Sequence, residues 1–253
     1  MKKNNIAFII QARLGSTRLP DKIIIPFYND LSIFDILIEK LKTNFKGMPI
    51  ILATSTNKEN DILEKIALEN DILAFRGDEN DVLKRFIDAA EHYNVNKIIR
   101  ICSDNPFLDM AELHRLVSFV ENNNYDYVSF DIEGTPSIKT HFGFWSEFVT
   151  LNTLKIVSTT TSLPLYHEHV TNYIYENSDK FNVCFLKPNK NVLGRKDVRM
   201  TLDTSEDFKI LSNIYKALSK KYDQLGIDEI INFLDVNSDY KNLMAEQIKI
   251  NKK

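Results

Sequence analysis

Cysteine is scarce in this chain. Only Cys102 and Cys184 occur among its 253 residues, which is too few for the disulfide framework that stabilises many small secreted domains. Both lie beside apolar residues that are typical of strands. We therefore expect two buried thiols in a reducing environment, and a cytoplasmic protein.

A long apolar run is also missing near the start of the chain. The first apolar run, residues 6–10, is followed directly by Gln11 and, two residues later, by Arg13. A membrane-spanning helix needs about 20 apolar residues, and the apolar part of a signal peptide is also longer than this run. We therefore expect neither a signal peptide nor a membrane partner.

Neither charge sign is in large excess. The chain has 32 Lys and Arg residues against 35 Asp and Glu residues, which gives a net charge of −3. This excludes the strongly basic balance that is typical of nucleic-acid-binding domains. With 43% hydrophobic and 26% charged residues, the composition is that of a globular domain. We expect no nucleic-acid partner and a single domain with a substantial core.

Two common nucleotide-binding motifs are absent. No G-x-G-x-x-G follows the first apolar run, and the chain has no G-x-x-x-x-G-K-[ST]. The first motif is typical of dinucleotide-binding oxidoreductases and the second of P-loop kinases. The sequence therefore predicts neither of these two classes of enzyme.

A basic loop after the first apolar run is the most informative feature that is present. Residues 6–10 are typical of a buried strand, and residues 11–22 read QARLGSTRLPDK. A glycine that lets the backbone approach a ligand, two hydroxyl donors and three cations suit a polyphosphate. These residues are Gly15, Ser16, Thr17, Arg13, Arg18 and Lys22. Because open α/β sheets bind ligands at the carboxyl ends of their strands, we interpret the segment as a phosphate-binding loop; a solvated basic loop is the alternative.

Strands and helices are predicted to alternate through the first half of the chain. Apolar residues at helical spacing predict helices between the strands, one of which Asn57 would cap. Such alternation predicts an α/β fold with a mostly parallel sheet and helices on both faces. After the first strand, further strands are predicted at residues 50–54, 73–75, 97–101 and 125–130.

The alternation of predicted strands and helices is interrupted at residue 131. A turn follows there, and then an irregular aromatic stretch, residues 142–148. We interpret residues 131–194 as an arm inserted into the single domain, for substrate binding or dimerisation. The elements predicted within and after the arm are helices at 151–158, 166–177, 206–219 and 227–233, strands at 182–186 and 198–202, and a polar tail at 247–253.

Two carboxylates, Asp104 and Asp203, each come just after a predicted strand. Because the carboxyl ends of parallel strands meet at one edge of a sheet, both are expected on the same edge as the basic loop. Mg²⁺ prefers oxygen ligands and often takes only one or two carboxylates besides phosphate oxygens and water. We therefore predict Asp104 and Asp203 as Mg²⁺ ligands; capping of the following turn or helix is the alternative for each.

Five segments of the chain stand out together, namely 9–22 (IIQARLGSTRLPDK), 76–83 (RGDENDVL), 103–106 (SDNP), 168–171 (EHVT) and 201–204 (TLDT). Between about residues 5 and 215, they resemble the cytidylyltransferases that activate acidic sugars, which include the CMP-Kdo and CMP-sialic acid synthetases. Within this family the chain is most similar to the branch named after spore coat polysaccharide biosynthesis protein F.

This resemblance implies a GT-A-like, Rossmann-like nucleotidyltransferase fold and transfer of CMP from CTP to an acceptor oxygen with release of pyrophosphate. It also implies Mg²⁺ as the cofactor and a homodimer built partly through the arm. Cations and a metal ion suit this reaction because they neutralise the leaving pyrophosphate. By position, the nucleotide-binding residues are Ala12, Arg13, Gly15, Ser16, Lys22, Arg76 and Asp104. The catalytic residues are Arg13, Lys22, Asp104 and Asp203.

The acceptor is expected to contact the arm. His141, Glu168 and His169 lie in the segment where relatives contact the acceptor, and histidines can bind anions or serve as a base. We therefore predict these three as acceptor-binding residues, and a sugar acid or a phosphorylated small molecule as the acceptor. A zinc pair formed by His167 and His169 is disfavoured because no third ligand is evident.

Two other functions share the expected fold. A GT-A-type glycosyltransferase would use the same sheet and metal, but residues 103–105 lack the second acid of an Asp-X-Asp motif. A non-catalytic nucleotide-binding scaffold would bind CTP without turnover, whereas the charged residues expected for catalysis are all present. We therefore predict a CTP-dependent cytidylyltransferase for the biosynthesis of a surface polysaccharide or glycan.

Overall fold

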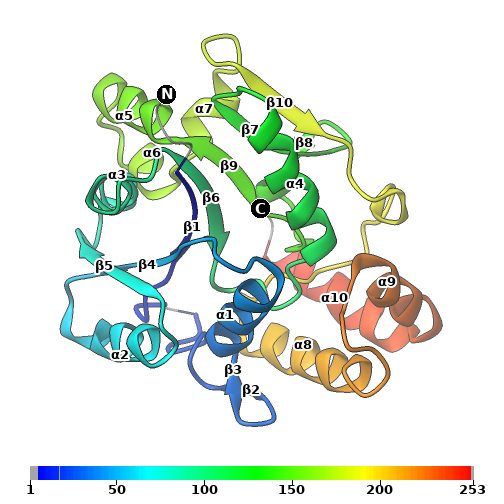
Figure 1. Ribbon diagram of the computed structural model, residues 1–253. Helices are drawn as coiled ribbons and strands as arrows, with labels where there is room; N and C mark the ends of the chain where they lie inside the picture. Colours follow the sequence, from blue (N-terminus) through cyan, green and yellow to red (C-terminus); the bar gives the residue numbers. More distant parts are fainter. Residues whose placement is uncertain (1–4, 17, 252–253) are drawn as a thin grey trace.

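A central β-sheet runs through the molecule, with helices on both of its faces (Figure 1). The computed structural model describes residues 5–16 and 18–251. The strands follow the order β10-β7-β9-β6-β1-β4-β5, with β8 paired to β7, and β2 and β3 form a separate hairpin. Their bounds are β1 (Ile6–Gln11), β2 (Pro26–Tyr28), β3 (Leu31–Ser32), β4 (Ile50–Ser55), β5 (Leu73–Gly77), β6 (Lys97–Cys102), β7 (Tyr127–Ile132), β8 (Thr135–Pro136), β9 (Glu147–Thr150) and β10 (Val183–Leu186).

Most neighbouring strands of the sheet are parallel. β1 is parallel to β4 and β6, β4 to β5, and β7 to β10. β9 is antiparallel to both of its neighbours, β6 and β7. The predicted α/β class and the mostly parallel sheet are therefore confirmed. β9 is not among the predicted strands because it is short and almost wholly buried, so its sequence lacks the polar–apolar alternation of a half-exposed strand.

The side chains of β1 show how the sheet is held in place. Successive residues of a strand point to opposite faces, and here Phe8 and Ile10 join one hydrophobic core while Ala7 and Ile9 join a second core. All four are fully buried. Burying a large apolar side chain contributes about 1.5–3 kcal/mol, so the two cores together fix the position of the sheet and of its carboxyl edge.

The helices divide between these two cores. α1 (Ile33–Asn44), α2 (Asp61–Glu69), α4 (Met110–Asn122), α8 (Ser205–Leu218), α9 (Ile227–Val236) and α10 (Ser238–Ile250) contribute to the first core. α3 (Val82–His92), α5 (Leu151–Thr160) and α7 (Asn172–Glu176) contribute to the second, and α6 (Pro164–Glu168) lies against α3. Within residues 5–16 and 18–251, the structure contains no helix that is both long and apolar enough to cross a membrane.

Several local predictions are wrong. Residues 198–202 form no strand, because the N–H group of Met200 bonds to the carbonyl of His141 instead of to a neighbouring strand. Residues 247–250 belong to α10 rather than to a polar tail, because α10 packs against α8 and α9. The predicted helix at 166–177 is split into α6 and α7.

Two further predictions need correction at the level of side chains. Asn57 precedes a short 3₁₀ turn, η1 (Lys58–Asn60), and its side chain makes no capping hydrogen bond. Neither Cys102 nor Cys184 is part of a disulfide, as expected, but both are half-buried rather than buried. Both lie at or within strands that are partly open to solvent at these positions.

Part of the predicted arm is built into the domain. Of residues 131–194, β9 pairs with β6 and β7, and β10 pairs with β7. α5 and α7 contribute to the second core. The arm is therefore partly a component of the central sheet, and its role in acceptor binding and dimerisation stays a prediction.

Candidate active site

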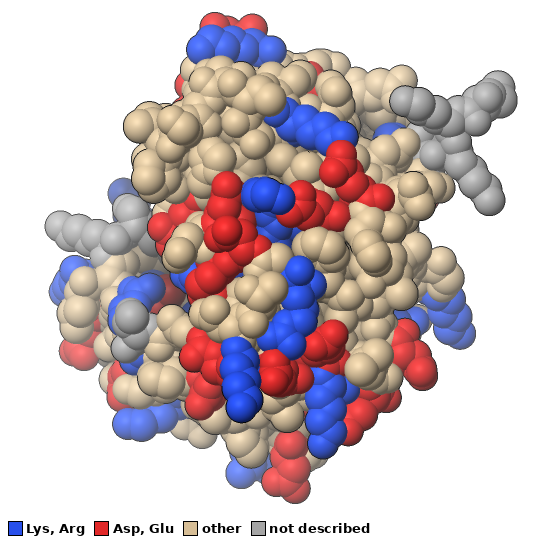
Figure 2. Space-filling model, turned by 90° about the vertical axis from the view of Figure 1, so that its left-hand side faces the viewer, with Lys and Arg blue, Asp and Glu red and all other residues tan. Residues whose placement is uncertain are grey.

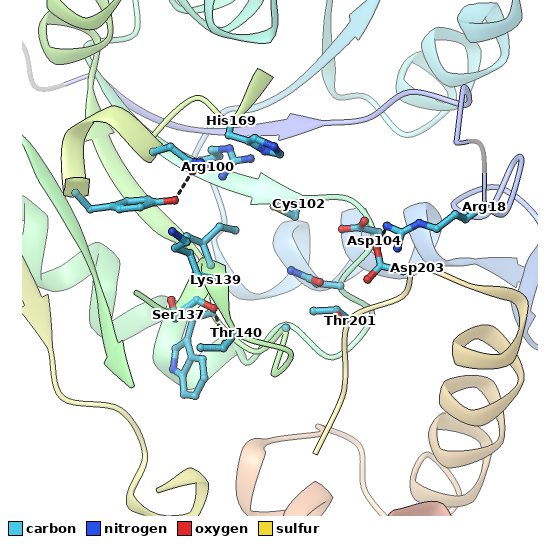
Figure 3. Close-up of a pocket in the computed structure, with 16 residues that line it drawn as sticks. Arg18, Arg100, Cys102, Asp104, Ser137, Lys139, Thr140, His169, Thr201 and Asp203 are labelled. Atoms are coloured by element: carbon cyan, nitrogen blue, oxygen red, sulfur yellow. Dashed lines mark hydrogen bonds and ion pairs between the residues drawn. The ribbon is translucent and has the colours of Figure 1, made fainter. Parts of the chain in front are cut away.

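A cavity of about 460 Å³ lies where β6 ends. Its walls come from β6, the loop after it, the 3₁₀ turn η2 (Ser137–Lys139), α7 and the segment before α8. Figure 3 shows that its two sides differ in character. One side carries two carboxylates beside a cation, namely Asp104, Asp203 and Arg18. The other side carries basic residues, namely Arg100, Lys139 and His169.

Lys22 joins the two chain segments that bear the carboxylates. Its Nζ donates to Asp104 Oδ2 at 2.7 Å and to the carbonyl oxygen of Leu202 at 2.7 Å. Leu202 immediately precedes Asp203, so a single ammonium group contacts both segments. The Lys22 side chain is only 14% exposed, whereas that of Asp104 is 34% exposed. The pair is thus partly shielded from water, and the predicted proximity of Asp104, Asp203 and the basic loop is observed.

Arg18 supplies a cation to the second carboxylate. Its Nη2 donates to Asp203 Oδ1 at 2.8 Å, and its Nη1 donates to Asn251 Oδ1 at 3.4 Å, just after α10. The Arg18 side chain is 56% exposed, and an ion pair this open to water adds little stability. The basic loop therefore places one cation on each carboxylate. Thr17, which was predicted as a donor in this loop, lies outside the described residues.

The backbone of the basic loop is held by contacts to β4 and η1. The buried Ala12 donates its N–H to a carbonyl of β4 at 3.4 Å, and Leu14 donates its N–H to Asn60 Oδ1 at 2.9 Å. A Cβ at Gly15 would lie 3.3 Å from a glutamate oxygen, and the Ser16 hydroxyl accepts a backbone N–H of the same loop. The chain itself therefore shapes this loop, and its contact with a nucleotide stays a prediction.

Arg100 is a nearly buried cation in the cavity wall. It donates to Glu147 and, at 3.1 Å, to Gln11 Oε1, and Glu147 also accepts the Tyr127 hydroxyl. Burial opposes the charge on Arg100, but nearby Cys102 and Glu147 outweigh it and raise the pKa of the guanidinium. Burial and Glu147 also raise the pKa of Tyr127 well above its usual value, so the phenol remains a donor. Arg100 therefore stays a cation with a fixed orientation.

Lys139, His169, Asn172 and Tyr175 complete the basic side of the cavity. Lys139 Nζ lies 3.5 Å from Glu176 Oε1, and its side chain is about half exposed. The Tyr175 hydroxyl donates to Asn172, and burial raises the pKa of this phenol, so it stays neutral. Lys139 adds a second cation to Arg100, and Asn172 and Tyr175 are neutral hydrogen-bonding partners. This side therefore suits an anionic ligand.

Arg13 and Glu168 line a different cavity, of about 560 Å³, together with His167. Arg13 Nη1 donates to Glu79 Oε1 at 3.2 Å, and Arg13 Nη2 lies 3.8 Å from Glu168 Oε1. The structure therefore places Glu168, one of the predicted acceptor-binding residues, beside Arg13 and outside the cavity with the two carboxylates.

Arg76 is held by acidic residues of α2. Its Nη1 donates to Asp61 Oδ1 at 2.6 Å and to Glu64 Oε2 at 3.0 Å, and its Nε donates to the carbonyl of Ser55 at 3.1 Å. Figure 2 shows the side of the molecule that carries α3 and β5 in Figure 1, where basic and acidic side chains lie intermixed. Arg76 is not part of the wall of the 460 Å³ cavity, and its predicted contact with cytidine stays a prediction.

His141 contacts other protein groups and is not part of the cavity wall. Its Nδ1 lies 2.6 Å from Arg199 Nη1, and its carbonyl accepts the N–H of Met200 at 2.7 Å. Gly143, two residues later, has φ +63°, and a Cβ there would lie 2.9 Å from the carbonyl oxygen of Met200. Glycine is therefore required for this close approach. Among the three predicted acceptor-binding residues, His169 is the one that lines the 460 Å³ cavity.

The two carboxylates suit a magnesium site with few protein ligands. Asp104 and Asp203 offer oxygen ligands in one cavity, and each already lies against a cation. Among the residues that the structure describes, no group of three or more His, Cys, Asp or Glu side chains is placed to hold a metal. A metal here would take two protein ligands and complete its shell with phosphate oxygens and water, as Mg²⁺ readily does. The metal itself stays a prediction.

Two residues of the site, Arg100 and Arg199, are not among those predicted from the sequence. Each lies among mainly apolar residues, in the segments 98–101 and 198–202, and each is buried and paired. Charged side chains are rarely buried without a partner or a function. A lone arginine within an apolar run is therefore the sequence signal that points to both.

Comparisons with known proteins place these observations in a family. Residues 7–248 match the cytidylyltransferase family. The chain is 38% identical over 237 residues to an uncharacterized protein of Methanocaldococcus jannaschii. This match covers 93% of this chain and 92% of that protein. The chain is also 32% identical over 243 residues to spore coat polysaccharide biosynthesis protein SpsF of Bacillus subtilis. This match covers 93% of this chain and 96% of SpsF.

Solved structures share the architecture. A cytidylyltransferase from Leptospira borgpetersenii matches with a TM-score of 0.81 at 30% identity, over 93% of this chain and 96% of that chain. A CMP:2-keto-3-deoxy-manno-octonic acid synthetase complexed with CTP matches with a TM-score of 0.60 at 12% identity, over 86% of this chain and 99% of that chain. At this low identity the second likeness concerns the fold alone.

Fold and site together define an α/β nucleotidyltransferase with a Rossmann-like sheet. Within this class, the chain belongs to the cytidylyltransferase family. The family resemblance and the enzyme class predicted from the sequence are thereby confirmed. The family match gives no support to the alternative of a GT-A-type glycosyltransferase.

Proposed function

We propose that the protein transfers CMP from CTP to a small acidic acceptor and releases pyrophosphate. The two-sided cavity is the observation that carries this proposal. On one side Lys22 and Arg18 meet Asp104 and Asp203, an arrangement that suits a metal-bound triphosphate. On the other side the buried Arg100 and the half-exposed Lys139 suit an anionic acceptor. The family supports CTP as the donor, and the related synthetase was solved with CTP.

In this proposal Lys22 and Arg18 change partners when the nucleotide binds. Phosphate oxygens take the place of the carboxylates as acceptors of their hydrogen bonds, which leaves Asp104 and Asp203 to hold Mg²⁺. When bound, Mg²⁺ supplies charge neutralisation at the phosphates and at the leaving pyrophosphate. Lys22 then stabilises the charge that develops around the α-phosphate, because its ammonium lies in a site partly shielded from water.

Arg100 and Lys139 hold the acid group of the acceptor in this proposal. Arg100 is fixed in advance by Glu147, and charge-assisted hydrogen bonds from such a cation to a carboxylate or phosphate are strong. The acceptor oxygen then lies toward Asp104 and attacks the α-phosphorus in line with the bond to pyrophosphate, which breaks. If the attacking group is a hydroxyl, its proton passes to solvent water. A sugar acid and a phosphorylated polyol both meet this description.

We also propose a cellular setting for the reaction. SpsF is named for spore coat polysaccharide biosynthesis, and by analogy the CMP-activated product here would serve a surface polysaccharide or glycan. We place the enzyme in the cytoplasm, with which its two cysteines, neither of them in a disulfide, are compatible. The proposed homodimer, in which residues 131–194 take part, is tested by size-exclusion chromatography with light scattering.

Pyrophosphate release tests the reaction. The protein is incubated with Mg²⁺, each of the four nucleoside triphosphates and a panel of sugar acids and phosphorylated polyols. We expect release that depends on CTP and on one class of acceptor. Asp104→Asn and Asp203→Asn should each lower kcat by at least about 100-fold, since each removes charge from the reacting centre. Asp235→Asn is the matched control, because Asp235 pairs with Arg195 outside the cavity.

The same assay tests the acceptor side. Lys139→Met should raise the KM for the acceptor about tenfold and leave the KM for CTP unchanged, because it removes one charge-assisted contact. Preference for another nucleotide, or unchanged activity in both aspartate variants, would contradict the proposal. Tight Mg²⁺-dependent binding of CTP without any pyrophosphate release would favour a non-catalytic scaffold instead.

A further inference from the structure

Arg199 is an almost fully buried arginine that contacts both Asp203 and His141. Its side chain is 1% exposed. Its Nε and Nη2 donate to the two carboxylate oxygens of Asp207 at 2.7 and 2.9 Å. Nη2 also donates to Asp203 Oδ2 at 2.8 Å, and Nη1 donates to His141 Nδ1 at 2.6 Å. Every nitrogen of the guanidinium therefore has an acceptor.

Asp207 holds Arg199 and the start of α8 together. Its Oδ2 also accepts the backbone N–H groups of Asp203 and Thr204 at 3.0 and 2.9 Å, and its own N–H donates to the Thr204 hydroxyl. Burial would raise the pKa of Asp207, but the hydrogen bond and charge of Arg199 outweigh burial and lower it. Asp207 is thus an anion that already neutralises Arg199. The charge of Arg199 is therefore already balanced by Asp207, and its hydrogen bond to Asp203 is a further contact beyond this ion pair.

His141 supports the arginine as an acceptor. A guanidinium can only donate hydrogen bonds, so the Nδ1 atom that faces Arg199 carries no proton and the ring is neutral. A protonated His141 would place two cations in contact. The carbonyl of His141 also accepts the N–H of Met200. The loop with His141 is therefore bound to both the side chain and the backbone of the segment that leads to Asp203.

We propose that Arg199 is a positioning residue that orients Asp203 for the reaction. This role rests on the proposed metal–nucleotide site. Arg199 donates a hydrogen bond to Oδ2 of Asp203, whereas Oδ1 accepts from Arg18 in the cavity wall. Oδ1 is therefore the oxygen presented to a metal, and the carboxylate is prevented from rotating. Groups that hold a metal ligand in this way commonly tune metal affinity without touching the metal.

Binding of Mn²⁺, followed by the electron paramagnetic resonance of the free ion with and without CTP, tests this role. Mn²⁺ is a suitable probe because it takes the same oxygen ligands as Mg²⁺. Arg199→Lys keeps the charge but loses the planar fork, and we expect the Kd for Mn²⁺ to rise at least about tenfold. His141→Leu removes an acceptor and should act in the same direction. His141→Asn restores an acceptor and should recover most of the affinity.

Arg195→Lys is the matched control. Arg195 forms a similar fork with Asp197 and a contact with Asp235, both outside the cavity, so the Kd for Mn²⁺ should not change. Circular dichroism and thermal unfolding establish that each variant is folded at the assay temperature. The two His141 variants keep the test available if Arg199→Lys does not fold.

Two outcomes would overturn the role of Arg199. One is an unchanged Kd for Mn²⁺ in folded Arg199→Lys, and the other is an equal loss of affinity in Arg195→Lys. A failure of the metal site itself looks different: Asp203→Asn would then bind Mn²⁺ as the wild type does, and both proposals would fall together. Loss of affinity in Asp203→Asn and Arg199→Lys, with recovery in His141→Asn, supports the inference.

Discussion

Three buried charged residues, Arg100, Glu147 and Arg199, shape the two sides of the cavity. Each is less than 10% exposed and each has an oppositely charged partner, as expected because an unpaired buried charge costs several kcal/mol. Glu147 accepts from Arg100, from the Tyr127 hydroxyl and from the Thr171 hydroxyl. A carboxylate of β9 therefore sets the orientation of a cation of β6.

Substitution of Glu147 tests this dependence. Glu147→Gln leaves the charge of Arg100 buried without its partner, and we expect the free energy of unfolding to fall by about 3 kcal/mol. Tyr127→Phe removes one hydrogen bond and should cost about 1 kcal/mol. Urea denaturation followed by circular dichroism measures both changes. Glu206→Gln, which removes an exposed pair with Lys209, is the control and should change stability by less than about 1 kcal/mol. A loss in Glu147→Gln no larger than in this control would show that Arg100 does not need Glu147.

Among the helices, α6 and α3 are joined by one histidine. His167 Nδ1 lies 2.8 Å from Asp81 Oδ2, and its Nε2 lies 2.9 Å from the carbonyl oxygen of Thr161. Asp81 is also the N-cap of α3 through the N–H of Lys84. Both partners of the ring are acceptors, so His167 makes both hydrogen bonds only when it is protonated. Because both ring nitrogens are engaged in this way, the alternative of a zinc pair with His169 gains no support.

The stability of this junction should depend on pH. Burial lowers the pKa of His167, but the contacts with Thr161 and Asp81 outweigh burial and raise it above its ordinary value of 6.5. A raised pKa in the folded state means that protonation stabilises the fold. This contribution is complete below pH 6.5 and is lost as the pH rises through the folded-state pKa.

Thermal unfolding of the wild type and of His167→Gln measures this effect. The wild type should exceed the variant in Tm most at about pH 5.5 and least at about pH 9, where the ring is neutral in both folded and unfolded chains. His92→Gln is the control, because His92 is an exposed histidine of α3. A difference in Tm that stays constant over this pH range would contradict the predicted link between α3 and α6.

Over the whole molecule, the site unites segments that are far apart in the sequence. Lys22 bridges Asp104 and the residue before Asp203. The end of the chain takes part as well, since Asn251 accepts from Arg18 and Gln247 from Thr204. A ligand that binds across these segments binds the folded chain and not the unfolded one, so it should stabilise the entire domain.

Thermal unfolding with nucleotide and metal tests this coupling. A ligand at about 100 times its Kd adds about 2.7 kcal/mol of stability, which corresponds to an increase in Tm of roughly 5–10 °C for a chain of this size. We expect such an increase with CTP and Mg²⁺ together, and a smaller one with CTP and a chelator. In Asp104→Asn, the part of the increase in Tm that depends on metal should be lost. Equal increases with metal and with the chelator would contradict a metal-linked nucleotide site.

Much of the fold is predictable from local pattern. β1, β4 and β6 are short, mainly apolar runs with a polar residue at or just after their ends, and the α/β class follows from their alternation with amphipathic helices. The antiparallel β9 and the helix α10 are not predictable in this way. β9 is too short and too buried to show a period, and α10 contributes one fully buried residue, Met244, so contacts with other elements decide its conformation.

The sequence by itself determined which chemical groups follow the strands: a basic loop after β1, a carboxylate after β6 and another before α8. Only the tertiary structure decided the partner of each group. It pairs Arg13 with Glu79, Lys22 with Asp104 and His141 with Arg199. Residues so distant along the chain meet only when the sheet and helices have packed. These contacts are therefore set by the three-dimensional arrangement of the elements, which cannot be predicted from any local pattern of residues.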